Sequence, residues 1–494
     1  MLLRLTAERR FRILQALLLT AVFALPGILY LRAFSPGDPD LWWHLRTGEW
    51  IVQHHAIPRT DPFSAYGAGK FWAPYSWLLE VFLFRLFQKW GLVSSIAYTA
   101  GMITAITAAL YRMIRRQLSD FVLAVLLTAA AMDVLSHYFA PRPWLCTILI
   151  FIFEIDILMH ARRTGDRRGL FLLPPLFILW ANIHVEFVAG LLFLGFAAAE
   201  PLAERWWPQK HSKLPPLTLW LVFAASVVAS LINPFGWRIY QIAYQLTNMP
   251  GAANLIQEMT SLSFRTQSEF VLLFLTLFCV GALAWSRRIP FFEFAVLGVA
   301  IIVSFHSGRE LYLLTVPAVA FLASVLPATE KGLGKPPAFA IPLIAAASGV
   351  VLWCTAFYLH VNNERIGRDL ANQLPVRAVE AIKNGHYRGP LFNTYDWGGY
   401  LIWDLRMPVG IDGRAVIYGD ERLARSMAIW SANSPWTADP DLSAAGIVIG
   451  AARLPLVQLL RLDPRFRLVY EDQVAVVFIQ PKLQAPAAQA SLAQ

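Results

Sequence analysis

The segment YSWLLEVFLFRLFQ, residues 75–88, decides how this chain is threaded through a membrane. It is apolar and rich in aromatic residues, but it carries Glu80 and Arg85 and is shorter than the roughly 17 to 25 apolar residues of a typical spanning helix. Charge facing lipid is costly, whereas an amphipathic helix on the surface keeps its charges in water. We therefore expect residues 75–88 to lie flat on the outer surface.

Eleven other apolar runs are candidate membrane spans. They centre near Ala21, Ala100, Leu127, Ile150, Ile178, Phe193, Val227, Leu275, Val299, Ala320 and Ala347. One basic cluster precedes the first run and five lie between later ones: Arg4/Arg9/Arg10/Arg12, then Arg112/Arg115/Arg116, Arg162/Arg163/Arg167/Arg168, Arg205/Lys210/Lys213, Arg287/Arg288 and Lys331/Lys335. Basic residues in short loops mark the cytoplasmic side, and all six clusters fall there only if residues 75–88 do not span. The pattern predicts about eleven spans, with the N-terminus inside and the C-terminus outside.

The composition supports a multi-pass membrane protein. Of 494 residues, 57% are hydrophobic and 15% charged, against about a quarter charged in soluble domains. The formal charge of +10 comes from basic residues in loops, which indicate topology rather than nucleic-acid binding. Cys146, Cys279 and Cys354 lie in apolar runs, so neither a disulfide framework nor a clustered zinc site is expected. The start resembles a signal sequence without a cleavage site, so we interpret it as an uncleaved first span.

A soluble domain follows the last span, because charged and turn-forming residues return after Tyr358. We expect a membrane module over residues 1–358, including a first external loop at 34–91, then a small α/β domain at 359–482 and a disordered tail at 483–494. Within the domain, LPVRAVEAIKNG predicts a helix ended by Gly385, and FRLVYEDQVAVVFI predicts two strands around a turn. PLFNTYDWGGYLIWDL predicts a strand, a glycine turn and a further strand or helix.

The predicted external loops hold nearly all the unusual polar residues. These loops contain SPGDPDLWWHLRTGEWIVQHHAIPRTDPFS, SHYFAPRP, WANIHVE, NPFGW and HSGRE. Charge kept beside a membrane tends to be functional, so their convergence on one face predicts a site there. Asp38 and Asp40 follow the first span directly, and either carboxylate could accept a proton from an acceptor hydroxyl as a sugar is displaced from a phosphate.

Such a transfer also needs positive charge on the leaving phosphate. Candidates for binding the substrates are His44, Arg142, His184, Glu186 and Arg309. An enzyme on the outer face has no assured supply of nucleotide sugars, so the expected donor is a lipid-linked sugar. No HExxH motif or tight ligand spacing is present, so we expect no metal cofactor, with a divalent cation as the alternative.

Structural roles are the alternatives for each of these residues. Asp-Pro-Asp is a common helix cap, Trp42 and Trp43 suit interfacial anchoring, and His54 and His55 suit a surface. Arg142 could extend to the interface, and His184 and Glu186 could form a structural network with Asn182.

Several stretches resemble the glycosyltransferase C superfamily, which includes protein O-mannosyltransferases, aminoarabinose transferases and Rgt-type transferases. They are DPDLWWHLRTGEWI, IPRTDPFS, APRPW, WANIHVEFVAG, LINPFGW, and NTYDWGGYLIW with IDGR. The resemblance implies a helical multi-pass fold, a polyprenyl-phosphate sugar donor, and a base in the first loop that falls on Asp40 or, alternatively, Asp38. The usual Asp-Glu pair is replaced here by Asp38-Pro39-Asp40. Asp396, Trp397, Asp412 and Arg414 either shape an acceptor site or build turns beside adjoining glycines.

The expected function is an inverting transfer of a hexosyl or pentosyl group to a cell-envelope glycan, lipid or protein, at the outer face of a bacterial inner membrane. The partners would be the lipid-linked donor, membrane lipid and that acceptor, without nucleic acid. A transporter or flippase is one rival, but it predicts inverted repeats, and we find no repeat. A non-catalytic envelope assembly factor is the other.

Overall fold

The computed structural model describes residues 7–33, 37–203, 205–207, 212–247, 249, 251, 255–287, 289–327 and 340–484. Of the tail predicted to be disordered at 483–494, residues 485–494 lie outside the described residues, as do Arg4, Lys210, Arg288, Lys331 and Lys335. Leu483 and Gln484 are helical, so the prediction is wrong for these two residues. The chain forms two compact units. Unit 1 comprises Met1–Phe34, Ser95–Ala243 and Glu258–Val361, and unit 2 comprises Ser35–Ser94, Tyr244–Gln257 and Asn362–Gln494. The first external loop thus shares a unit with the C-terminal domain, whereas the division expected at residue 358 places it with the membrane helices.

Unit 1 is a bundle of apolar helices, and every predicted apolar centre lies within one of them. The helices are α1 (Ala7–Ala33), α4 (Val93–Gln117), α5 (Phe121–Leu135), α6 (Trp144–Thr164), α7 (Leu173–Ala181), α8 (Phe187–Ala203), α9 (Pro216–Ser230), α12 (Gln267–Trp285), α13 (Phe291–His306), α14 (Leu311–Val325) and α15 (Ala340–Tyr358). Among the described residues, seven segments are long and apolar enough to cross a membrane, whereas the apolar helices at α7, α8, α9 and α13 are shorter. The number of helices that span stays a prediction.

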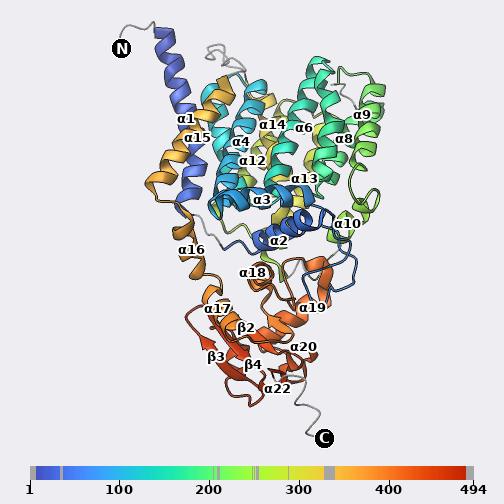
Figure 1. Cartoon of the computed structure of the whole chain (residues 1–494). Coiled ribbons are helices and arrows are strands. Elements are labelled where there is room, and N and C mark those ends of the chain that lie inside the picture. The colour runs from blue at the N-terminus through green and yellow to red at the C-terminus, as the bar shows by residue number, and fades with distance from the viewer. Residues whose placement is uncertain are drawn as a thin grey trace. The chain divides into compact units, whose positions relative to one another are not determined.

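Burial separates a central helix of this bundle from a peripheral pair. All residues from Leu311 to Ala323 of α14 are buried, so this helix is the centre of the core. In contrast, only 22% and 17% of the apolar windows of α1 and α15 are buried, as in lipid-facing helices. These two helices lie side by side (Figure 1), joined by the Ser348 hydroxyl, which donates to the Thr20 carbonyl at 3.0 Å.

Three helices of unit 1 are also joined by a buried ion triad. On α6, Arg162 donates from Nε to Glu200 of α8 at 2.8 Å and from Nη1 to Glu293 of α13 at 2.9 Å. All three side chains are less than a tenth exposed. Because each carboxylate faces the same guanidinium, the triad fixes the lateral spacing of the three helices.

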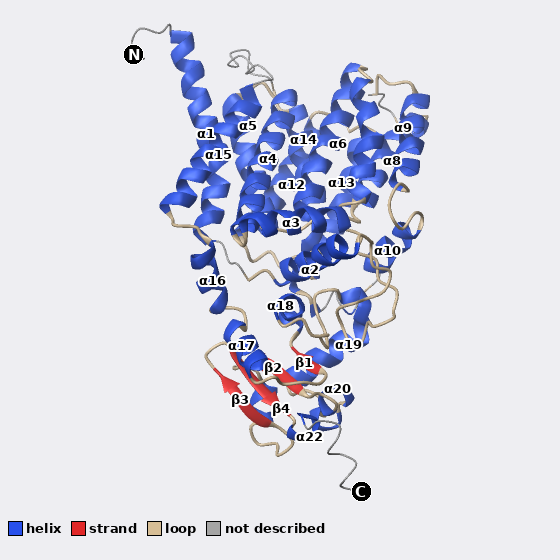
Figure 2. Ribbon diagram, in the orientation of Figure 1, coloured by secondary structure: helices blue, strands red, loops and turns tan. Residues whose placement is uncertain are grey.

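Unit 2 combines two helices of the first loop with an α/β domain. The helices are α2 (Pro39–His54), α3 (Trp77–Trp90), α16 (Asn363–Ala371), α17 (Val376–Asn384), α18 (Gly398–Asp404), α19 (Ala415–Trp430), α20 (Pro440–Ser443), α21 (Pro455–Leu460) and α22 (Pro481–Gln484), and α10 (Arg238–Thr247) crosses the boundary between the units. The strands are β1 (Leu391–Asn393), β2 (Ile447–Ala451), β3 (Arg467–Glu471) and β4 (Ala475–Ile479), in the order β1-β2-β4-β3. Among these four strands, β1 and β2 pair in parallel and the other neighbours pair antiparallel, and α17 packs on β3 and β4 (Figure 2).

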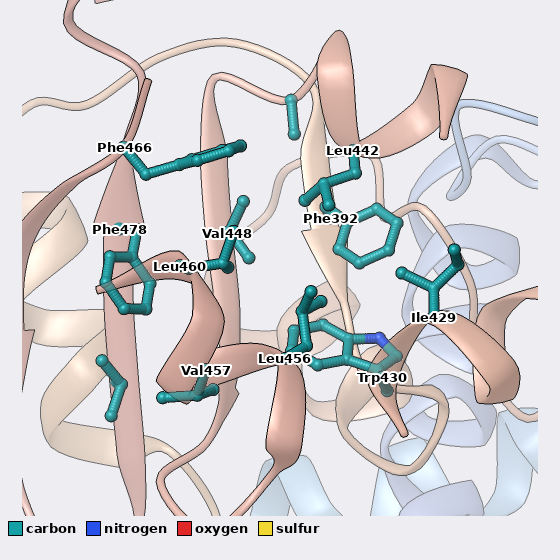
Figure 3. Packing of buried hydrophobic residues seen from close by; sticks show 12 residues of the cluster. Phe392, Ile429, Trp430, Leu442, Val448, Leu456, Val457, Leu460, Phe466 and Phe478 are labelled. Atoms are coloured by element: carbon teal, nitrogen blue, oxygen red, sulfur yellow. The ribbon is translucent and has the colours of Figure 1, made fainter. Parts of the chain in front are cut away.

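The predicted helix and the predicted pair of strands in this domain are confirmed. The predicted helix is α17, and Gly385 is its C-cap. The two strands around a polar turn are β3 and β4. PLFNTYDWGGYLIWDL forms β1 followed by helix α18, but the predicted glycine turn is wrong, because Gly398 and Gly399 are the first residues of that helix. Beside the sheet lies an apolar core that includes Phe392, Trp430, Leu460 and Phe478 (Figure 3).

Candidate functional site

The two candidate acids occupy different positions at the start of α2. Asp38 is the N-cap, and its Oδ1 accepts a hydrogen bond from the backbone N–H of Asp40 at 2.9 Å. Pro39 follows at the first helical position, where its missing N–H costs nothing. Asp40 lies in the first turn, where the helix dipole stabilises negative charge. The cap expected of Asp-Pro-Asp is therefore made by Asp38.

The Asp40 carboxylate is held by its own helix and lies against the C-terminal domain. Trp43, one turn along α2, donates from Nε1 to Asp40 Oδ1 at 3.0 Å. Gly413 of the IDGR motif approaches so closely that a Cβ at this position would collide with Asp40 Oδ1. A Cβ on Gly399 would likewise meet the Pro39 carbonyl oxygen. Two glycines from distant motifs therefore allow the C-terminal domain to pack on the N-terminus of α2.

One turn beyond Asp40, His44 forms a buried pair with Glu80 of α3. The His44 Nδ1 and Glu80 Oε1 atoms lie 3.0 Å apart, and both side chains are almost wholly buried. Burial raises the pKa of Glu80, and the hydrogen bond with His44 opposes only part of that shift. Gly48 has no side chain to separate α2 from the Glu80 carbonyl, so the two helices pack closely. The pair fixes the orientation of the imidazole.

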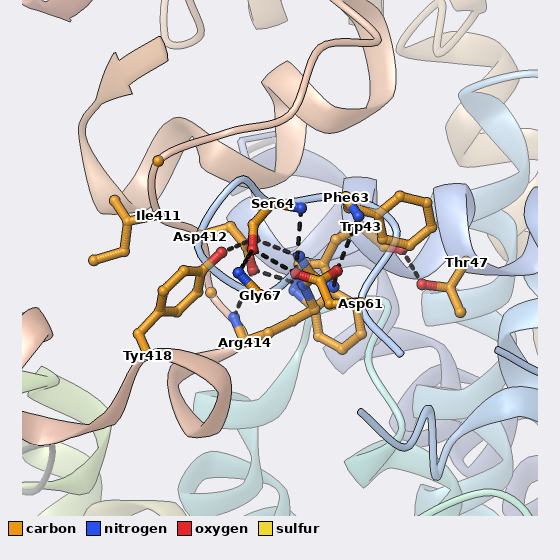
Figure 4. Close-up of polar contacts among 12 residues, drawn as sticks. Trp43, Thr47, Asp61, Phe63, Ser64, Gly67, Ile411, Asp412, Arg414 and Tyr418 are labelled. Carbon is orange, nitrogen blue, oxygen red and sulfur yellow. Dashed lines mark hydrogen bonds and ion pairs between the residues drawn. The ribbon is translucent and has the colours of Figure 1, made fainter. Parts of the chain in front are cut away.

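A second buried network joins the first loop to the IDGR motif (Figure 4). Arg414 donates from Nη1 to Asp61 at 2.6 Å, and from Nε and Nη2 to Asp412 at 2.8 and 2.7 Å. Tyr418 donates its hydroxyl to Asp412 at 2.5 Å. Burial lowers the pKa of Arg414, but the two aspartates raise it by more, so the guanidinium stays charged.

Aromatic rings and backbone pairing support this network. The Arg414 guanidinium lies over the rings of Trp72 and Phe63, at 4.7 and 5.3 Å from their centroids. The backbone N–H of Val409 donates to the Phe63 carbonyl, and that of Ala65 donates to the Val409 carbonyl. The loop after α2 is thus bonded to the C-terminal domain by both backbone and side chains.

The sequence alone left the roles of some residues in these buried networks open and did not single out others. The sequence left two alternatives for Asp412 and Arg414, an acceptor site or turns. In the structure they have a third role, as buried ion-pair partners. Asp61 and Glu80 were not among the candidates. The available signals were the acid in IPRTDPFS and the acid within the apolar residues 75–88, because a carboxylate needs a partner once it is buried.

The remaining candidates lie in unit 1. Arg142 pairs with Glu258, with 3.3 Å between Nη1 and Oε2, and lies 4.6 Å from the Trp144 ring centroid. Tyr138 donates its hydroxyl to the Arg309 carbonyl at 2.9 Å and accepts from the Trp144 indole N–H through its own carbonyl. The loops that carry Arg142 and Arg309 therefore meet around Tyr138.

His184 and Glu186 lie in the loop between α7 and α8. His184 is buried, and its Nδ1 lies 2.9 Å from the hydroxyl of Thr147 on α6. Burial raises the pKa of Glu186, and the charge of Arg309 opposes part of that shift. Asn182 donates to the carbonyls of Ile178 and Ile232 at 2.8 Å each, which is a structural role.

Other residues weighed from the sequence take structural positions. Trp42 is buried and meets Tyr400 edge to face at 5.1 Å, and Trp43 binds Asp40, so neither lies on an exposed surface. His54 and His55 are exposed. Within the described residues, no group of three or more His, Cys, Asp or Glu side chains is arranged to hold a metal ion.

The fold is similar to that of solved membrane transferases. The oligosaccharyltransferase of Archaeoglobus fulgidus in its apo form matches with a TM-score of 0.55 at 11% identity, over 88% of this chain and 69% of that one. The same organism's oligosaccharyltransferase AglB, in complex with an inhibitory peptide and a dolichol-phosphate, matches with a TM-score of 0.54 at 12% identity, over 97% and 75%. The chain has the glycosyltransferase C fold.

ArnT from Cupriavidus metallidurans bound to undecaprenyl phosphate is also similar, with a TM-score of 0.47 at 13% identity over 97% of this chain and 100% of that one. No protein-family model and no curated protein matches the chain. With the glycosyltransferase C fold and, in the part of the chain that the structure describes, seven segments able to span, the chain is a multi-pass membrane protein.

Proposed function

We propose that this chain is an integral membrane glycosyltransferase that moves a sugar from a polyprenyl-phosphate donor to a cell-envelope acceptor. The observation that carries it is the position of Asp40, in the first turn of α2 and directly against Gly413 of the C-terminal domain. A glycosyltransferase C fold supports it, since AglB, which shares that fold, was solved with a dolichol-phosphate. The sugar is a hexose or pentose, and its linkage is inverted.

Asp40 is the general base. The acceptor hydroxyl oxygen bonds to the anomeric carbon as the bond from that carbon to the phosphate oxygen breaks, and Asp40 takes the hydroxyl proton. The products are the glycosylated acceptor and the polyprenyl phosphate, which keeps the bonding electron pair. Asp38 is the competitor for this role, but its engagement as N-cap favours Asp40.

The charge on the leaving phosphate is balanced by side chains of the protein. We assign this role to Arg142 and Arg309, with His44, His184 and Glu186 orienting the donor or acceptor. The pair of His44 with Glu80 suits an orienting role, because the imidazole is held at a fixed angle. The reaction needs no nucleotide and no metal ion, so transfer should continue in excess EDTA.

The active face is the outer face of a bacterial inner membrane, with the N-terminus in the cytoplasm and the C-terminal domain outside. The positions of the basic clusters support this orientation. Labelling of single cysteines with a membrane-impermeant maleimide would test it. Residues in the C-terminal domain should react in intact spheroplasts, and those in the basic loops should not.

The function itself is tested by transfer from radiolabelled polyprenyl-phosphate hexoses and pentoses in membranes that contain the chain. Wild type should transfer label to an envelope acceptor, and Asp40→Asn should lose transfer while accumulating in the membrane at the same level. Asp369→Asn, which changes an exposed carboxylate on α16, is the matched control and should transfer normally. Absence of transfer by wild type from every donor would contradict the function, and full transfer by Asp40→Asn would contradict the base.

A further inference from the structure

Unit 2 contains a hollow of about 650 Å³ within the C-terminal domain. This volume lies in the range of small-molecule sites, about 300–1,000 Å³. It lies between the segment before α18, the end of α19, the end of β2 and the turn between β3 and β4. None of the functional roles assigned above uses it.

The lining mixes aromatic rings with hydrogen-bonding groups of both kinds. Tyr395, Trp397 and Trp430 supply rings, and amides and hydroxyls come from Asn372, Gln373, Gln473, Thr394, Ser426 and Ser431. Hydroxyl-rich ligands are bound by such combinations, because each hydroxyl both donates and accepts while the apolar ring faces pack on aromatic side chains.

The charge of the hollow is balanced. Among the residues that line the hollow, one is acidic, Asp396, and one is basic, Arg453. Asp396 offers carboxylate oxygens that accept hydrogen bonds from hydroxyl groups, and Arg453 offers N–H groups that donate to them. A strongly anionic ligand would need an excess of basic residues, which the lining lacks.

An extended peptide is also a poor fit. Peptides that add to a domain in extended form pair with the free edge of a sheet. The outer strands of this sheet are β1 and β3, and the lining includes no residue of either. Its residues come from the end of β2 and from turns and helices, which present side chains rather than a row of free backbone groups.

The hollow is linked to the neighbourhood of Asp40 through one short segment. Tyr395, in its wall, donates its hydroxyl to the carbonyl of Gly413 at 3.2 Å. Gly413 in turn contacts the Asp40 carboxylate, and Gly399, two residues beyond Trp397, contacts the Pro39 carbonyl. A ligand bound in the hollow would thus contact the segment that packs on the start of α2.

We infer that this hollow binds an uncharged glycan portion of the acceptor. The claim that the hollow is an acceptor subsite rests on the proposed transferase activity. The claim that it binds a glycan does not depend on that activity. The subsite would hold sugar units distant from the reacting hydroxyl, so that the energy of binding them positions the acceptor.

The test measures binding directly on the full-length chain in nanodiscs. Saturation-transfer NMR titrations would use neutral tetrasaccharides of glucose, mannose and galactose as probes, with an uncharged octapeptide alongside. At least one tetrasaccharide should bind wild type and Asp40→Asn equally, because Asp40 lies outside the hollow. Asp396→Ala and Arg453→Ala should weaken binding by about tenfold, as expected for loss of a hydrogen bond to a charged or polarised group.

Two control variants outside the hollow and one variant that fills it show whether any loss of binding is specific to the hollow. Glu421→Gln and Arg467→Ala change exposed residues outside the lining and should bind as wild type does. Ser431→Trp should block binding by bulk without removing Asp396 or Arg453. Binding of no tetrasaccharide, equal binding by the lining variants, or binding of the octapeptide alone would overturn the inference. If Asp40→Asn loses transfer but still binds the glycan, both the proposed transferase and the proposed glycan site are supported. A failure of transfer and a failure of glycan binding are measured separately, so either proposal can fail without the other.

Discussion

Each unit of this chain buries one arginine between two carboxylates, yet the two triads differ in what surrounds the acids. In unit 1, Glu200 and Glu293 accept hydrogen bonds from Arg162 alone within the described part of the chain. In unit 2, Asp61 also accepts from backbone N–H groups, and Asp412 accepts from Tyr418. The first triad therefore depends wholly on its arginine, whereas the second is one element of a wider hydrogen-bonded network.

The two triads also differ in what they can affect. Arg162 joins three helices and has no contact with a candidate site residue among its hydrogen bonds. Arg414 follows Gly413 directly, and Gly413 contacts the Asp40 carboxylate. The same chemistry thus serves assembly of the helices in unit 1 and the position of the reacting group in unit 2.

Arg162→Met should give the largest loss of stability. It leaves two buried carboxylates without a cation, which costs about 3–5 kcal/mol in comparable cases. The thermal unfolding midpoint in detergent should fall accordingly, while transfer per folded molecule stays near that of wild type. Arg163→Met, at the exposed neighbouring position, is the control and should change neither quantity.

Arg414→Met should lose less stability but more activity per folded molecule. Asp61 and Asp412 keep other hydrogen-bond donors when Arg414 is replaced. The loss of folding free energy should therefore be about 3 kcal/mol, the lower end of the range for a buried carboxylate that loses its cation. Because Gly413 loses its fixed position beside Asp40, transfer per folded molecule should fall by about tenfold or more. Equal specific activity in Arg414→Met and Arg162→Met would contradict the distinction between the two triads.

Gly413→Ala should change activity with little change in stability. The added Cβ meets the end of the Asp40 side chain, which can rotate away, so the fold tolerates it at a cost below about 1 kcal/mol. The displaced carboxylate should lower the rate of transfer by about tenfold. Gly367→Ala on α16, where an added Cβ meets nothing within 4 Å, should leave the rate unchanged.

Glu80→Gln should give the smallest effect, visible in the dependence of stability on pH. Because burial raises the pKa of Glu80 above its ordinary value of 4.5, the folded unit retains a proton that the unfolded chain releases. The stability from this proton is fully present below pH 4.5 and is lost as the pH rises through the raised pKa. Unfolding midpoints should therefore fall with rising pH in wild type relative to Glu80→Gln, and parallel curves would contradict the shift.

Much of the fold was predictable, because hydropathy and turn chemistry act locally. The apolar centres from Ala21 to Ala347 lie in helices, and β3 and β4 are the two strands predicted on either side of the polar turn at Asp472 and Gln473. The position of the first loop was not predictable in this way. Its attachment to the C-terminal domain depends on Asp61 meeting Arg414, which lies 353 residues further along the chain.

The site was predictable in part for the same reason. An acid after the first span indicated Asp38 and Asp40, but only the geometry of α2 separates the capping acid from the one in the first turn. The importance of Gly413 could not be seen from local sequence, because its small size matters only through a contact with Asp40.

The most direct measurement compares Asp40→Asn with Asp38→Asn in purified protein, as the rate of sugar transfer from a polyprenyl-phosphate donor. Asparagine caps a helix about as well as aspartate, so Asp38→Asn should keep α2 intact and transfer within about twofold of wild type. Asp40→Asn removes the base and should lower the rate by about 10²–10⁴-fold with the unfolding midpoint preserved. A large loss in Asp38→Asn alongside near-normal transfer by Asp40→Asn would contradict the assignment of Asp40 as the reacting carboxylate.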